Sequence, residues 1–125
     1  MPASRDPTTP AQRIVVVGPC ASGKTTLAGR LRELGFDARV CGQEHTEIHD
    51  LWLSLEPDVL VALTLDLATL RARRSPSWPE RLYHVQQERL RDAYAAADVV
   101  IDTASTPLDD VVARVLALVV PGSVN

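Results

Sequence analysis

The chain of 125 residues has few aromatic residues (4%) and only two cysteines, Cys20 and Cys41. The cysteines do not stand in a CxxC or other ligand-like spacing, which disfavours a structural metal site and predicts reduced cytosolic thiols. The net charge of −3 gives no overall field that would attract nucleic acid or an anionic membrane. No apolar run reaches the roughly 18 residues of a membrane span, and no signal-like segment opens the sequence. We therefore expect a cytoplasmic protein with no nucleic acid or membrane partner.

The remaining composition is that of one globular domain, since 46% of the residues are hydrophobic and 23% are charged. Residues 1–12 are polar and contain Pro2, Pro7 and Pro10, so we expect a flexible N-terminal arm. The predicted domain covers residues 13–120, and residues 121–125 are predicted to form a tail.

Strand-like and helix-like segments alternate along this domain. Short apolar runs rich in β-branched residues predict strands buried on both faces, and apolar residues spaced three and four apart predict helices. The expected strands are 13–18, 37–42, 58–66 and 98–102, and the expected helices are 25–35, 46–55, 67–74, 80–97 and 106–120. This order predicts an α/β fold, a three-layer arrangement in which a parallel sheet of about four strands carries helices on both faces.

The sequence GPCASGKTT follows the first predicted strand and opens the first predicted helix. It matches the pattern GxxxxGK[ST], in which glycines let backbone N–H groups turn inward toward phosphate oxygens at the positive end of a helix. In this chemistry Lys24 reaches the β- and γ-phosphates, and the Thr25 hydroxyl is a ligand of Mg²⁺. The candidate residues for binding a nucleoside triphosphate are Gly18, Pro19, Cys20, Ala21, Ser22, Gly23, Lys24, Thr25 and Thr26.

With this loop the chain resembles the small P-loop kinases of nucleosides, nucleotides and other metabolites, a group related to adenylate and shikimate kinases. Residues 58–74 are similar to the group's later strand and arginine-bearing lid helix, and residues 95–119 to its closing strand, loop and helix. The resemblance implies a P-loop NTPase fold, ATP and Mg²⁺ as cofactors, and transfer of the γ-phosphoryl group to a small acceptor. It also implies that Arg73 and Arg74 act with Lys24 as catalytic residues, and that residues 103–107 border the adenine ring.

Each of these assignments beyond the loop has a simpler alternative. Arg73 and Arg74 would also suit a solvated helix end, where basic side chains complement the helix dipole. Residues 103–107 would also suit a plain connection between a strand and a helix.

A carboxylate on the Mg²⁺ side is expected in such kinases, and Glu44 is our candidate. It follows the second predicted strand, and residues just beyond the carboxyl ends of strands line the ligand crevice of an open α/β sheet. His45 is a candidate for a neighbouring polar contact, although both residues would also fit a solvated loop. The rival carboxylates are Asp66, which can instead cap the helix that begins after it, and Asp102. His45 and His49 are four residues apart, as in a metal pair, but the sequence offers no third ligand beside them.

The segment from residue 40 to residue 56 is short for a site that must hold both a metal and an acceptor. A second hypothesis is therefore a reduced module that binds ATP or GTP without efficient phosphoryl transfer. No LSGGQ-like or NKxD-like string is present, which disfavours a transporter ATPase and a GTPase. The acceptor, the choice between ATP and GTP, and catalytic activity stay open. A homodimer that completes the site is a hypothesis with no motif behind it.

Overall fold

The computed structural model describes residues 12–119. Its elements are β1 (Arg13–Val17), α1 (Lys24–Glu33), β2 (Asp37–Val40), the short 3₁₀ helices η1 (Gln43–His45) and η2 (Leu51–Leu55), β3 (Val59–Thr64), α2 (Leu67–Arg73), α3 (Glu80–Ala96), β4 (Val99–Asp102) and α4 (Leu108–Val119). The four predicted strands are confirmed. The predicted tail, and the predicted arm apart from Gln12, lie outside the described residues. None of the helices in the described range is long and apolar enough to cross a membrane.

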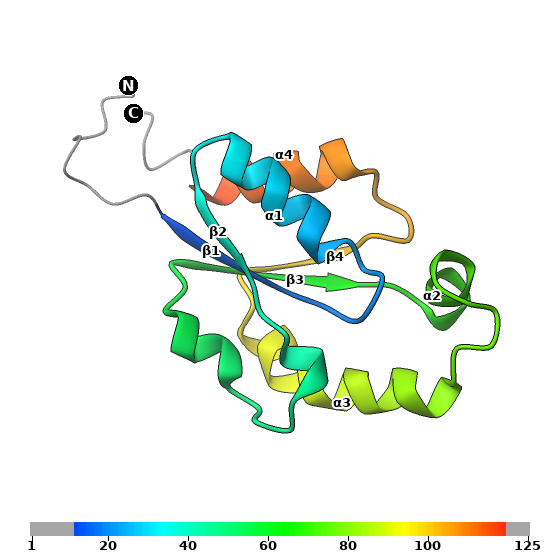
Figure 1. Cartoon of the computed structure of the whole chain (residues 1–125). Coiled ribbons are helices and arrows are strands. Elements are labelled where there is room, and N and C mark those ends of the chain that lie inside the picture. The colour runs from blue at the N-terminus through cyan, green and yellow to red at the C-terminus, as the bar shows by residue number, and fades with distance from the viewer. Residues whose placement is uncertain (1–11, 120–125) are drawn as a thin grey trace.

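The four strands form one parallel sheet in the order β2-β1-β3-β4, which confirms the α/β prediction (Figure 1). β1 lies inside the sheet, where Ile14 pairs with Ala38 of β2 on one side and with Val59 of β3 on the other. Because the strands are parallel, all their carboxyl ends meet at one edge. The loops that follow β1, β2, β3 and β4 are therefore brought together there.

Helices cover both faces of this sheet. On one face α1 and α4 pack over Ile14 and Val16, and on the other α3 packs over Val15 and Val17 (Figure 1). This alternation explains the apolar run of β1, since all four of these valine and isoleucine side chains are fully buried. The arrangement is compatible with a three-layer fold.

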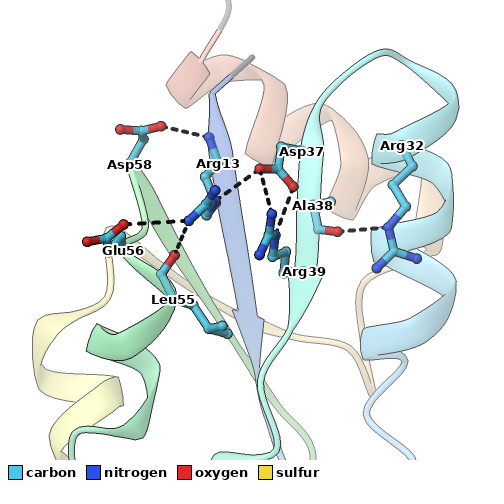
Figure 2. Close-up of polar contacts among 8 residues, drawn as sticks. All are labelled: Arg13, Arg32, Asp37, Ala38, Arg39, Leu55, Glu56 and Asp58. Atoms are coloured by element: carbon cyan, nitrogen blue, oxygen red, sulfur yellow. Dashed lines mark hydrogen bonds and ion pairs between the residues drawn. The ribbon is translucent and has the colours of Figure 1, made fainter. Parts of the chain in front are cut away.

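The amino ends of the strands are held by a polar network around Arg13 (Figure 2). The Arg13 backbone N–H donates to Asp58 Oδ2 at 2.7 Å, and its guanidinium donates to Asp37 Oδ2 at 3.0 Å and to the Leu55 carbonyl at 2.9 Å. Hydrogen bonds from Arg39 and then Arg13 lower the pKa of Asp37. These contacts lie at the amino ends of the strands, opposite to the loops that follow their carboxyl ends.

The prediction of an α-helix over residues 46–55 is wrong, and the buried Gln43 side chain gives the reason. Its amide lies between two groups that an α-helix would join directly, because Nε2 donates to the Ile48 carbonyl at 2.6 Å and Oε1 accepts from Trp52 N–H at 3.2 Å. Thr46 does not cap a helix but accepts a bond from Ile48 N–H at 3.0 Å. This side-chain bridge replaces the helical hydrogen bond, and only the 3₁₀ helix η2 remains.

Candidate functional site

The glycine-rich loop, residues 18–23, connects the carboxyl end of β1 to the amino end of α1. Two of its residues have left-handed backbone conformations, Ala21 with φ of 64° and Gly23 with φ of 97°. Gly23 is the residue before α1, and no side chain caps the helix there. The first backbone N–H groups of α1 lack partners within the helix, so they are available to an anion at this end.

Gly18 is required by close packing at the start of the loop. A β-carbon added to it would lie 2.6 Å from Ser22 Oγ and 3.0 Å from the Leu63 carbonyl oxygen of β3. A larger residue would therefore push the loop away from the sheet.

Lys24 lies at the centre of the site and forms an ion pair with Glu44. Its Nζ is 2.8 Å from Glu44 Oε2 and also donates to the carbonyls of Gly18 at 2.8 Å and Pro19 at 3.0 Å. The two side chains are only 10% and 4% exposed, so little solvent screens their attraction. Glu44 Oε1 has no hydrogen-bond partner within residues 12–119. From the sequence we expected Glu44 to lie near the loop, and in the structure its carboxylate contacts Lys24.

The two histidines that stand four residues apart in the sequence, His45 and His49, lie in different places. His45 Nε2 is 3.3 Å from Glu44 Oε2, and the His45 side chain is 63% exposed. His49 Nδ1 instead lies 3.8 Å from Asp92 Oδ2 on α3. The structure therefore joins His45 to the site and does not pair it with His49.

Arg73 is the last residue of α2 and Arg74 follows it, and both lie beside the glycine-rich loop. Arg73 donates to the Ala21 carbonyl at 2.9 Å and to the Thr103 carbonyl at 2.7 Å, so it ties the loop to the connection after β4. The Arg74 guanidinium lies 5.8 Å from the centre of the Trp78 ring, and Arg74 lines the cavity beside the loop. Arg73 is thus bound to the protein backbone, whereas Arg74 lines the larger cavity beside the loop.

Two cavities flank the loop. The larger, of about 440 Å³, is bounded by the start of α1, by the segment after β2 and by α2; its polar lining includes Lys24, Thr25, Glu44, His45 and Arg74. The smaller, of about 190 Å³, lies between Gly23 and the connection after β4. Apolar and polar side chains both line it, the apolar ones being Leu27, Leu63, Leu108 and Val111 and the polar ones Ser22, Thr26, Arg73, Thr103 and Thr106. Residues 103–107 therefore border a cavity next to the loop.

The rival carboxylates are engaged elsewhere. Asp66 Oδ1 accepts from Thr69 N–H at 3.1 Å, which confirms the predicted cap of α2. Hydrogen bonding by the Thr69 side chain, and then by the Thr69 backbone, lowers the Asp66 pKa. Asp102 accepts from Ala104 N–H at 2.9 Å and from Ser105 Oγ at 3.1 Å. Both residues are exposed, and the carboxylate in contact with Lys24 is that of Glu44.

One buried residue of the site was missed by the sequence analysis. Gln86 of α3 is 2% exposed; its Oε1 accepts from Cys20 N–H at 3.1 Å, and its Nε2 donates to Cys20 Sγ at 3.3 Å. A signal was available, because Gln86 lies four residues after Leu82 and four before Leu90, within the apolar stripe of the helix. A polar residue in that stripe indicates a buried hydrogen-bonding partner.

The assembled site combines a buried cation, a buried carboxylate, free helix N–H groups and an arginine around one cavity. Such a set can bind a phosphorylated ligand and stabilise negative charge that develops on it. No protein-family model matches the chain, and the comparison with curated proteins gives no match.

Proposed function

We propose that the protein binds ATP with Mg²⁺ through residues 18–26 and transfers the γ-phosphoryl group to a small acceptor. The observation that carries this proposal is the Lys24 ammonium, buried against Glu44 in a cavity that the loop and the first turn of α1 line. A cation held at the amino end of a helix, beneath a loop with left-handed residues, suits a chain of phosphates. The proposal includes the P-loop NTPase type of fold, which the motif favours.

Phosphate binding changes the partners of Lys24. In the structure its ammonium is held by Glu44 and by the carbonyls of Gly18 and Pro19. Phosphate oxygens would take up Lys24, while the N–H groups of the first turn donate to the same oxygens. Glu44 is then released to the metal side of the site. The exposed Thr25 hydroxyl and Glu44 would hold Mg²⁺, which supplies charge neutralisation between the phosphates.

Phosphoryl transfer needs positive charge around the transferring group, and Arg74 is placed to supply it. Its side chain lines the larger cavity together with Lys24. Arg73 acts differently, because its guanidinium already holds the Ala21 and Thr103 carbonyls, and it fixes the shape of the loop. The acceptor would occupy the part of the larger cavity next to His45, and the nucleobase would lie in the smaller cavity.

The alternative is a module that binds the nucleotide without efficient turnover. The observation that favours it is that Arg73 and Glu44, two charged groups beside the loop, already have protein partners. Arg73 is engaged by backbone carbonyls, and Glu44 is neutralised by Lys24. Both hypotheses share the phosphate-binding loop and differ in turnover.

Calorimetry with a non-hydrolysable ATP analogue and Mg²⁺ tests binding, and release of ADP in the presence of candidate acceptors tests turnover. Lys24→Met should abolish binding of the analogue. For a kinase, Arg74→Ala should lower kcat about a hundredfold while the affinity changes little, because the arginine acts mainly in the transition state. Arg91→Ala is the matched control, since Arg91 pairs with Glu88 on the surface of α3.

Absence of binding to the wild-type chain, or equal binding by Lys24→Met, would overturn the proposal. Binding with background turnover that Arg74→Ala leaves unchanged would favour the module over the kinase.

A further inference from the structure

Three potential metal ligands converge at the loop, and Cys20 is remote in sequence from the other two, the adjacent residues Glu44 and His45. The ligand atoms of Cys20, Glu44 and His45 all lie within 4.8 Å of one another. Cys20 comes from the loop after β1, and Glu44 and His45 come from η1 after β2. Because the two strands are neighbours in the sheet, their carboxyl ends bring a thiol, a carboxylate and an imidazole to one place.

This donor set suits zinc more than magnesium. Cysteine sulfur and histidine nitrogen are preferred by Zn²⁺ and related transition metals, whereas Mg²⁺ prefers oxygen. Tetrahedral ligands about 2.0–2.3 Å from zinc lie roughly 3.3–3.8 Å from one another. His45 Nε2 and Glu44 Oε2 are already 3.3 Å apart, and the exposed His45 ring is free to rotate toward the sulfur. Three protein ligands leave one tetrahedral position open to the cavity.

Two buried groups support a metal at this point. Glu44 is 4% exposed at its side chain, and Oε1 has no hydrogen-bond partner within residues 12–119, although a buried carboxylate oxygen normally has one. Gln86 is 2% exposed, and its side-chain amide forms hydrogen bonds with both the backbone N–H and the Sγ of Cys20. A buried amide that donates to a ligand sulfur is a typical outer-shell partner in metal sites.

We propose that Cys20 Sγ, the Glu44 carboxylate and His45 Nε2 bind a transition-metal dication of the zinc class. Binding forms a metal–sulfur bond and releases the thiol proton to solvent. Lys24 opposes it, because its ammonium lies 2.8 Å from Glu44 Oε2 and a dication there would be repelled. The metal therefore displaces Lys24 from Glu44. This site needs no nucleotide, so it does not depend on the proposed kinase function.

The test uses reduced protein, with Co²⁺ as a spectroscopic probe and Zn²⁺ in calorimetry, both without nucleotide. Wild-type protein should give a sulfur-to-cobalt charge-transfer band that Zn²⁺ abolishes. Cys20→Ser should remove the band, and His45→Gln and Gln86→Leu should each weaken Zn²⁺ binding about 10- to 100-fold. Lys24→Met should tighten Zn²⁺ binding, since it removes the competing cation. Cys41→Ser and His49→Gln are the matched controls and should bind like wild type.

The proposal is overturned if wild-type protein gives no cobalt–thiolate band, if Cys20→Ser retains the band, or if His45→Gln binds Zn²⁺ like wild type. The His45 variant keeps the test decisive even if a change at the buried Cys20 disturbs folding, because His45 is 63% exposed at its side chain. Tighter binding by Lys24→Met supports competition for Glu44, and weaker binding refutes it. Loss of nucleotide binding in the same variant would bear only on the proposed function.

Discussion

The buried Lys24–Glu44 pair gives the sharpest prediction for stability. Lys24→Met would leave the Glu44 carboxylate 4% exposed, with Oε1 unpartnered and His45 as its remaining polar neighbour. Removing one member of a buried ion pair typically costs about 3–5 kcal/mol, because an uncompensated charge stays in the interior. We expect a loss of that size in the free energy of unfolding.

Substituting the other member of the pair, Glu44, should lower the free energy of unfolding by less. In Glu44→Gln the Lys24 ammonium keeps the carbonyls of Gly18 and Pro19 at 2.8 and 3.0 Å, and the glutamine retains an oxygen that can accept a hydrogen bond. We expect a loss of about 1–2 kcal/mol, the scale of one weakened hydrogen bond to a charged group. The double variant should be more stable than the sum of the single losses predicts, by about 2 kcal/mol, because it leaves no unpaired charge.

Urea unfolding of the four proteins at neutral pH measures these differences, with tryptophan fluorescence and far-UV circular dichroism as independent probes. At a slope of roughly 2 kcal/mol per molar urea, the loss in Lys24→Met would lower the midpoint by about 2 M. Equal losses in the two single variants would contradict the asymmetry. Additivity within about 0.5 kcal/mol in the double variant would show that the ion pair contributes no coupling energy.

Three further predictions concern packing and pH. Gly18→Ala should destabilise the protein by about 1–3 kcal/mol, because the added β-carbon would meet Ser22 Oγ and the Leu63 carbonyl. Gly29→Ala should stabilise it by about 0.5–1 kcal/mol, because Gly29 lies inside α1 with open space around it. Thermal unfolding compares the two variants with wild type. The pKa of Asp37 is lowered by Arg39 and Arg13, so its stabilisation is present above the unfolded value of 3.8 and is lost as pH falls through the folded value. Asp37→Asn should therefore lower the urea midpoint at about pH 7 and have no such effect near pH 2. Burial raises the pKa of Tyr94, so its stabilisation is present below the ordinary value of 10 and is lost at higher pH; Tyr94→Phe should flatten the fall in stability above about pH 10, as measured by alkaline unfolding.

Much of the fold could be predicted because the information is local. β1 and β3 are continuous apolar runs, and the cap of α2 by Asp66 depends on residues only three positions apart. The segment from residue 46 to residue 55 could not be predicted in the same way. Its helical spacing is real, but the amide of Gln43 occupies the hydrogen-bonding groups of Ile48 and Trp52. The Gln43 side chain, five and nine residues from its two partners, thus overrides the helical spacing.

The residues of the candidate site also differ in whether the sequence predicts them. Lys24 and the loop follow from a contiguous motif, and Glu44 follows from the rule that ligands bind beyond the carboxyl ends of strands. The approach of Cys20 to His45 has no local signal, because it depends on β1 and β2 being neighbours in the sheet. The spacing of the cysteines disfavoured a metal site in the sequence analysis, because spacing patterns detect only ligands that are close together in the sequence.

Both proposed ligands act on the contact between Lys24 and Glu44. A phosphate would draw the ammonium away from the carboxylate, and a zinc-class ion would displace the ammonium from it. For a phosphate without Mg²⁺, each event would make the other easier, and by linkage the two ligands would raise each other's affinity by the same factor. Mg²⁺ would instead compete with the zinc-class ion, because both would need the Glu44 carboxylate. The metal-bound form would still hold phosphate through Lys24 but would have committed Glu44 away from Mg²⁺. On these proposals, a metal at Cys20, Glu44 and His45 would convert a kinase site into one that binds its nucleotide without transferring the phosphoryl group.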